Sequence, residues 1–133
     1  MFSFPAKLAS LAALQGLVSV AAGAFGAHAL TKILDQNALS WWHTGSQYLM
    51  YHALAGLLVA ALASYLPAAK KIILLFLLGN LIFAGSLYIM ALTGVLWLGA
   101  ITPIGGVCYL LAWFFLMKGL WQWKSHSQNV DVN

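Results

Sequence analysis

The stretch W-W-H-T-G-S-Q-Y-L-M-Y-H-A-L-A-G, from Trp41 to Gly56, contains the sharpest change from polar to apolar sequence in this chain. It begins with two tryptophans, a residue type that favours the interface between a membrane and water. His52 follows about 15 Å further along, at the helical rise of about 1.5 Å per residue. Because an ionisable side chain is costly in hydrocarbon, it should face protein rather than lipid. The stretch therefore predicts a membrane-spanning helix that carries a buried histidine.

The composition is that of an integral membrane protein. Of the 133 residues, 63% are hydrophobic and only 6% are charged, whereas about 25% of a typical soluble domain is charged. Four spans of about 20 residues each would use most of this length. We therefore expect one all-α membrane domain, residues 1–124, followed by a polar tail, residues 125–133.

Four apolar segments are long enough to cross a bilayer, and short breaks separate them. Ser40 is a suitable N-cap for the second segment, and Pro67 should end it. Pro103 should kink the fourth segment or open its first turn. Short turns at 67–71 and 93–94 join the later segments, so consecutive helices should form antiparallel hairpins within a four-helix bundle. The predicted spans are residues 8–30, 42–66, 71–93 and 97–120.

The first apolar segment has a competing interpretation as a cleaved signal peptide, because Ala27-His28-Ala29 has the form of a cleavage site and Lys7 precedes the run. The apolar core of a signal peptide is only about 7 to 15 residues long, and this segment is longer. It also carries small residues four apart, such as Ala12 and Gly16, which allow close helix packing. We therefore expect a helix that stays in the bundle.

The lysines predict the orientation. All six basic residues are lysine, and with four spans five of them would lie on one side, against Lys32 alone on the other. By the positive-inside rule, both termini should be cytoplasmic. Scattered lysines without arginine do not indicate nucleic-acid binding. The expected partners are membrane lipid, another membrane protein, or a second copy of the chain in a homo-oligomer.

Counting residues from the basic turn at 67–71 gives a height for each polar side chain. At equal rise per residue, His52 and Tyr88 should lie at the same height, so Tyr88 is the leading candidate for a partner of His52 from another span. His28 should lie at the outer edge of the hydrocarbon. The outer half should thus be the polar half, with a candidate outward-facing polar pocket formed by His28, Tyr48, His52, Tyr88 and Thr102.

The same count predicts contacts between small residues and one polar pair. Gly56 should approach Gly85, and Gly85 should approach Gly106. Gln15 lies eight residues from Lys7 and Asn80 nine residues from Lys71, so the two amides should lie at one depth and share a hydrogen bond or a partner. The candidate helix-packing glycines are Gly16, Gly23, Gly26, Gly56, Gly85, Gly105 and Gly106.

Groups that commonly catalyse reactions are scarce. There is no glutamate, and the two aspartates, Asp35 and Asp131, lie in a loop and in the tail. The second helix has no pair of histidines at metal-ligand spacing, the single Cys108 lacks a partner, and the glycine-rich runs are not phosphate-binding loops. We therefore predict no enzyme activity, metal site or cofactor. Two classes of function stay open: a structural or accessory membrane protein, and a protein that handles a small molecule or protons in a pocket around His52.

Five short motifs, in order along the chain, resemble the YgdD-like family of small bacterial inner-membrane proteins. They are G-A-F-G-A-H at 23–28, T-G-x-x-Y at 44–48, Y-H-A-L at 51–54, G-S-L-Y at 85–88 and T-P-I-G-G at 102–106. The resemblance extends from about residue 8 to residue 120. It implies a four-helix inner-membrane protein of a family with no assigned biochemical function.

Overall fold

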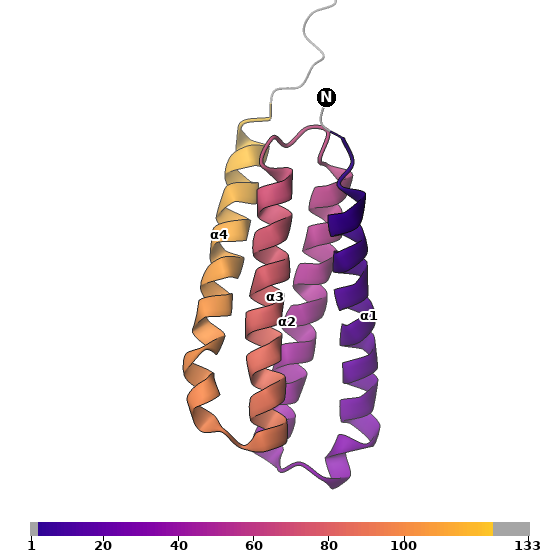
Figure 1. The fold of residues 1–133 in the computed structure, drawn as a ribbon, viewed down its shortest axis with the longest axis vertical. Helices are drawn as coiled ribbons and strands as arrows, with labels where there is room; N and C mark the ends of the chain where they lie inside the picture. The colour runs from indigo at the N-terminus through magenta and orange to yellow at the C-terminus, as the bar shows by residue number, and fades with distance from the viewer. Residues whose placement is uncertain (1–2, 124–133) are drawn as a thin grey trace, which may run out of the picture.

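The computed structural model describes residues 3–123, which form four long helices and two short 3-10 helices. Figure 1 shows the long helices side by side, with neighbours in sequence joined at alternate ends. We call the end that contains the α2–α3 connection the basic end, because Lys7, Lys70 and Lys71 lie near it, and the other end the opposite end. The elements are α1 (Ala6–His28), η1 (Leu30–Lys32), α2 (Gln36–Ala61), α3 (Ala69–Thr93), η2 (Leu96–Ala100) and α4 (Thr102–Trp121).

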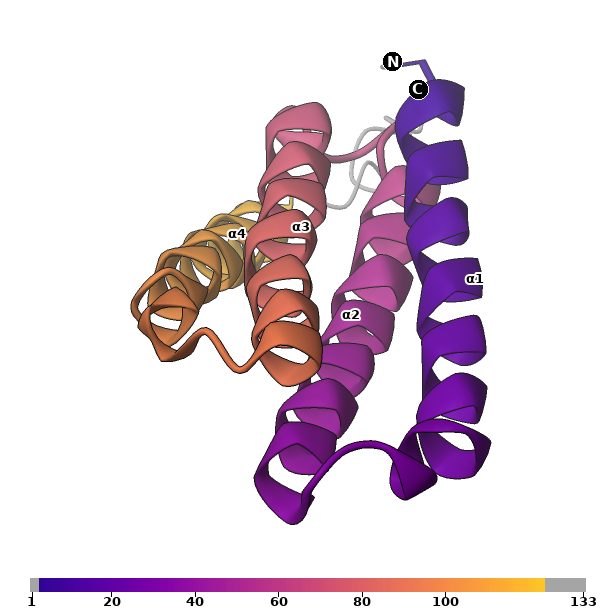
Figure 2. The same ribbon diagram turned by 60° about the horizontal axis from the view of Figure 1, so that its bottom comes forward.

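The four long helices form a row about a central pair. α2 and α3 pack extensively on each other, while α1 packs mainly on α2 and α4 mainly on α3. Figure 2 accordingly shows α1 and α4 at opposite edges of the molecule. Each of the two outer helices therefore buries less of its surface than α3 does.

The start of α2 differs from the prediction. The helix begins at Gln36, six residues before the predicted span, and its N-cap is Asp35 rather than Ser40. The Asp35 carboxylate accepts a hydrogen bond from the backbone N–H of Ala38 at 2.8 Å. Aspartate is as good an N-cap as serine, and its negative charge also suits the positive end of the helix dipole. Ser40 therefore lies inside the helix.

The later helix boundaries follow from turn chemistry. α2 ends at Ala61, and turn residues follow it before Pro67 is reached. α3 ends at Thr93, and its C-cap is Gly94, whose φ of 71° is in the left-handed region that glycine adopts without strain. The predicted fourth span divides into η2 and α4, and Pro103 lies in the first turn of α4, where its missing N–H costs no helical hydrogen bond.

This is an all-helical membrane protein. Among the described residues, three segments are long and apolar enough to cross a membrane: α1, α3, and Leu96–Trp121. α2 is as long as the others, but its first half contains the polar residues of the Trp41–Gly56 stretch. The prediction of a fourth span thus rests on α2.

Two apolar clusters hold the helices together. The large cluster extends from the basic end to the middle of the helices, where Ile72, Ile73 and Phe76 of α3 are fully buried against small residues of α1, α2 and α4. The small cluster lies near the opposite end and consists of Leu30, Ala38, Trp42 and Ala91. The polar side chains described next lie between and around these two clusters.

Candidate functional site

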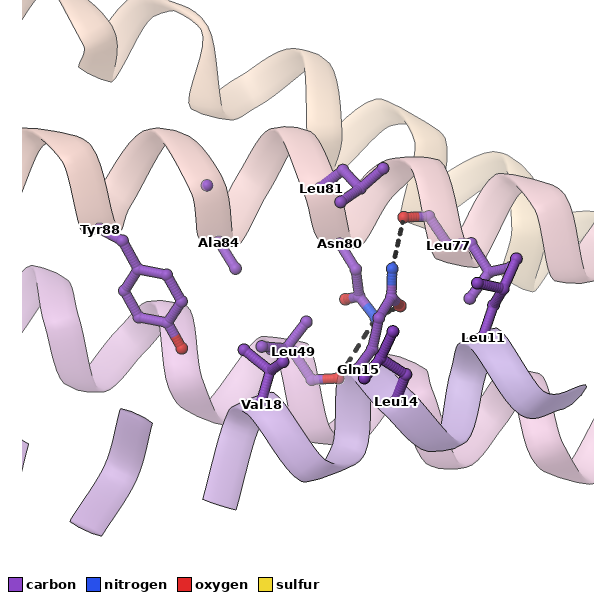
Figure 3. Close-up of a pocket in the computed structure, with 11 residues that line it drawn as sticks. Leu11, Leu14, Gln15, Val18, Leu49, Leu77, Asn80, Leu81, Ala84 and Tyr88 are labelled. Carbon is purple, nitrogen blue, oxygen red and sulfur yellow. Dashed lines mark hydrogen bonds between the residues drawn. The ribbon is translucent and has the colours of Figure 1, made fainter. Parts of the chain in front are cut away.

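Asn80 connects all four long helices. Its side chain is 1% exposed, and its Nδ2 donates hydrogen bonds to Oε1 of Gln15 on α1 at 2.8 Å and to the carbonyl of Leu49 on α2 at 3.3 Å. Its Oδ1 accepts a bond from the hydroxyl of Tyr109 on α4 at 2.7 Å. Gln15 also donates to the carbonyl of Leu77 at 3.1 Å. The predicted contact between Gln15 and Asn80 is confirmed. Figure 3 shows the two side chains together, with dashed lines to the carbonyls of Leu77 and Leu49.

This arrangement satisfies the amide of Asn80 inside the protein. Both of its N–H groups donate and its oxygen accepts, so no part of it requires water. Each such bond between helices contributes about 0.6 to 1.7 kcal/mol in a membrane. Tyr109 was not among the predicted site residues, although folding the chain about 93–94 brings it opposite Asn80 to within about one helical turn. It was overlooked because it lies in a long apolar run.

His52 is buried, as predicted, but its neighbours are not the predicted ones. Its side chain is 5% exposed, and Nδ1 lies 2.7 Å from the backbone carbonyl of Tyr48. Because a carbonyl only accepts, Nδ1 carries the hydrogen in this contact. The imidazole stacks on the ring of Tyr109, with centroids 3.5 Å apart and planes at 7°. The predicted partner, Tyr88, instead shares a hydrogen bond with Ser46 at 2.8 Å.

The height count for His52 was wrong because the chain reverses earlier than assumed. α2 ends at Ala61 and α3 begins at Ala69, so residues counted as helical rise belong to the turn. His52 therefore lies beside Phe76, with ring centroids 5.6 Å apart, rather than beside Tyr88, which is 12 residues or about 18 Å further along α3. The same error made the predicted neighbour of Gly56 wrong, because Gly56 faces Ala12 and Ile73 rather than Gly85.

The five residues of the candidate pocket do not form one pocket in the described part of the chain. Tyr48 and His52 are neighbours, with ring centroids 5.9 Å apart, and Tyr48 is 40% exposed. His28 is exposed in the last turn of α1. Thr102 bonds to Ser86 at 2.6 Å, and Tyr88 packs on Trp42. The predicted outward-facing pocket is therefore incorrect as a single site.

Toward the opposite end, serine and tryptophan side chains bond to neighbouring helices. Ser19 donates to the carbonyl of Ser46 at 2.7 Å, and the indole Nε1 of Trp42 donates to the carbonyl of Ala22 at 2.7 Å. Ser46 and Ser86 were not among the predicted site residues. A signal for both was present, because each serine follows a glycine in the sequence.

Some of the predicted packing glycines face a neighbouring helix, and the others face open space. A Cβ at Gly26 would lie 2.5 Å from Cδ1 of Trp42, and one at Gly105 would lie 2.6 Å from the backbone nitrogen of Phe83. A Cβ at Gly56 or Gly16 would meet a neighbouring helix at ordinary contact distance, 3.4 Å from Cβ of Ala12 and 3.9 Å from Cβ of Ala53, respectively. A Cβ at Gly23, Gly85 or Gly106 would meet open space, so the prediction of packing roles for these three was wrong.

Two close contacts between a glycine and a tyrosine were missed. A Cβ at Gly79 would lie 2.7 Å from the ring of Tyr109, and one at Gly45 would lie 3.3 Å from the ring of Tyr88. In both places the glycine makes room for a tyrosine from the next helix. Gly79 thus lets Tyr109 reach Asn80.

An open groove lies beside the Asn80 and Gln15 side chains, between α1 and α3. Its volume is about 340 Å³. Figure 3 shows its leucine walls, with Gln15 and Asn80 in the middle and Tyr88 toward one end. Most of the lining is hydrocarbon: Leu11, Leu14, Gln15, Val18, Leu49, Leu77, Asn80, Leu81, Ala84, Gly85 and Tyr88.

Comparison with known proteins identifies relatives over most of this chain. Residues 22–106 match the model of a family described as "Protein of unknown function (DUF423)". The chain is 43% identical to the UPF0382 membrane protein YwdK of Bacillus subtilis over 110 residues, which is 80% of this chain and 89% of the relative. It is 42% identical to a UPF0382 membrane protein of Haemophilus influenzae over 123 residues, 90% of this chain and 97% of the relative.

A third relative carries a more specific location in its name. The UPF0382 inner membrane protein YgdD of Escherichia coli is 37% identical over 110 residues, 81% of this chain and 84% of the relative. The names of these three relatives record a membrane protein and no activity. No solved structure matches the chain.

Proposed function

This chain belongs to the DUF423 family of membrane proteins, whose function is unknown, and on that basis we propose a structural or accessory role for it. In this proposal it is a non-catalytic inner-membrane protein with four spans and cytoplasmic termini. It acts by associating with another membrane protein or with a second copy of itself.

The observation that carries the proposal is the hydrogen bonding of Asn80. An amide that joins four helices and is satisfied within the protein stabilises a fixed arrangement of those helices. Catalytic and transport sites instead need polar groups that are free to meet a substrate or an ion. The separation of His28, Tyr88 and Thr102 from His52 also argues against a shared pocket, so we do not propose the small-molecule or proton-handling alternative.

The proposed orientation rests on the lysines of the described chain. Lys7, Lys70, Lys71 and Lys118 lie toward one end of the row and Lys32 toward the other. The positive-inside rule favours the cytoplasm for the first group. Lys124 and the 125–133 tail lie outside the described residues.

Cysteine labelling tests this orientation. In a Cys108→Ser background, Gln36→Cys should react with a membrane-impermeant thiol reagent added to intact cells, and Ala68→Cys should react only after the cells are opened. The reverse pattern would contradict the proposal. Labelling of both positions from one side would show that α2 does not cross the membrane.

Photo-crosslinking in living cells tests the accessory role. A photoreactive amino acid at Leu17 or Leu110, which are strongly exposed on α1 and α4, should give a discrete adduct with a second copy or with one membrane protein. The same amino acid at the fully buried Phe76 should give no such adduct and is the control. Adducts with lipid alone at both exposed positions would argue against an accessory role.

Proteoliposomes test the rejected alternative directly. Vesicles that contain the purified protein should acidify no faster than empty vesicles after an external pH drop, and His52→Gln should not change the rate. Acidification that depends on His52 would instead favour a proton-handling function.

A further inference from the structure

We propose that the groove between α1 and α3 binds one anionic phospholipid, with an acyl chain in the groove and the phosphate between Lys7 and Lys70. This inference rests on the proposed placement of α1 and α3 in a membrane. It requires neither a particular orientation nor a protein partner.

The groove suits a hydrocarbon chain. Its walls carry Leu11, Leu14 and Leu81, which are about half exposed or more. The two amides along it, Gln15 and Asn80, are already bonded to each other and to neighbouring carbonyls. A ligand in the groove therefore does not need to supply hydrogen bonds to these amides. In a bilayer an apolar acyl chain can fill the groove without leaving a polar group unpaired.

Each of the two helices that border the groove, α1 and α3, carries a lysine near the basic end. Lys7 precedes Leu11, Leu14 and Val18 by four, seven and eleven residues, so it lies on the same face of α1 as these lining residues. Lys70 precedes Leu77 by seven residues on α3 and likewise shares the groove face. The adjacent Lys71 is turned by about 100° from that face.

The two lysines also lie at similar heights. Lys7 is eight residues, or about 12 Å, from Gln15, and Lys70 is seven residues, or about 11 Å, from Leu77. Because Gln15 donates a hydrogen bond to the Leu77 carbonyl, Gln15 and Leu77 lie at the same height along the helices, and the two distances can be compared. Lys7 and Lys70 thus flank the same end of the groove.

The basic end has room and charge for a phosphate. A cavity of about 150 Å³ lies there, lined in part by Ser3 and Lys70. Lys7 and Lys70 are both exposed. Within residues 3–123 the only carboxylate side chain is that of Asp35, next to η1 at the opposite end, so neither lysine has a carboxylate counter-ion in this part of the chain. Basic sites between transmembrane helices are where anionic headgroups bind.

The test titrates phosphatidylglycerol or phosphatidylcholine into the full-length protein, delipidated in mild detergent, and counts bound lipids by native mass spectrometry. We expect one phosphatidylglycerol to bind before any phosphatidylcholine. Lys7→Gln and Lys70→Gln should each weaken this binding about fivefold, the effect of one lysine near an anionic lipid. Lys71→Gln is the matched control and should change it less than twofold.

A second pair of variants tests the acyl chain. Gly85→Leu places a side chain in the groove, where a Cβ meets open space, and should weaken phosphatidylglycerol binding at least fivefold. Gly106→Leu makes the same change at an equally open position outside the groove and should leave binding unaltered. If Gly85→Leu fails to fold by circular dichroism, Leu14→Trp fills the same groove.

Several outcomes would overturn the inference. Equal binding of the two lipids, or equal losses from Lys70→Gln and Lys71→Gln, would mean that no specific headgroup site exists. Full binding to the groove-filled variants would exclude an acyl chain there. Displacement of the lipid by millimolar inorganic phosphate would mean that the two lysines bind a free anion. A dimer formed by a photoreactive amino acid at Leu14 would mean that the groove binds a second copy of the chain. A reversed labelling pattern would contradict only the proposed orientation.

Discussion

The two ends of this helix row are held together by different interactions. Toward the basic end, the large cluster packs small and aliphatic side chains closely, with Ala12 and Gly56 in contact between α1 and α2. Toward the opposite end, side chains such as Trp42 and Ser19 donate hydrogen bonds to carbonyls of the neighbouring helix. Asn80 lies between the two regions and bonds to all three other helices.

The difference shows two ways to join helices without a hydrophobic driving force. In lipid, leucine gains little by leaving hydrocarbon, so helices associate through close packing or through hydrogen bonds. Packing fails when volume is added, whereas hydrogen bonding fails when a donor is removed. Both kinds of failure can be measured as a change in the free energy of unfolding in detergent micelles.

The largest effect should come from added volume near the basic end. Ala12 is fully buried against α2, so Ala12→Leu should separate α1 from α2 and destabilise the protein by about 3 kcal/mol. The neighbouring Ala13 is exposed, and Ala13→Leu should change stability by less than about 0.5 kcal/mol. Equal effects of the two variants would contradict close packing in this region.

The next largest effect should come from Asn80. Asn80→Leu removes three hydrogen bonds to three helices, which at about 0.6 kcal/mol each amounts to about 2 kcal/mol. Tyr109→Phe removes one of these bonds and should cost about 0.6 kcal/mol. In the Asn80→Leu background Tyr109→Phe should have almost no effect, and an undiminished effect there would mean that the two side chains are not coupled.

A smaller effect should come from loss of a donor near the opposite end. Trp42→Phe removes the indole N–H that bonds to Ala22 but keeps an aromatic ring beside Tyr88. We expect a loss of about 1 kcal/mol. Trp41→Phe is the matched control, because no hydrogen bond of the Trp41 indole is present among the described residues, and it should have a smaller effect.

The smallest effect should come from replacing His52 with phenylalanine. The hydrogen bond of His52 goes to the Tyr48 carbonyl of its own helix, so replacing it leaves no group on another helix unpaired. His52→Phe also keeps a ring that can stack on Tyr109 and should cost less than about 0.5 kcal/mol. His52→Leu loses that stack and should cost about 1 kcal/mol. A large loss with phenylalanine would point to a second, necessary contact of the imidazole.

The height of a side chain along the bundle could be predicted only where the count of residues began inside its own helix. Gln15 and Asn80 were paired correctly because both counts started at a lysine within the first turn of its helix. The count for His52 ran through the turn that follows Ala61, so its height was wrong by more than three helical turns. This error in height is why Tyr88 was paired with His52 rather than with Ser46. Counting residues also gives no rotation about the helix axis.

The prediction of close glycine contacts succeeded only in part for the same reason. Gly105 meets the backbone of α3 and Gly106 meets open space, although they are adjacent in sequence. A step of one residue turns the side chain by about 100°. Small residues therefore indicate that a helix packs closely, but their spacing alone does not say on which face.

The row arrangement has a consequence for how the protein is made. Most helix contacts are between helices that are consecutive in the chain, so contacts form between segments that are close in sequence, which favours rapid folding. Under the proposed four-span arrangement, the least apolar helix, α2, leaves the ribosome when α1 is already available. The carbonyl of Ala22 and the hydroxyl of Ser19 can then bond to it at once. In this proposed arrangement, helix α1 would supply hydrogen-bond partners to α2 as α2 inserts.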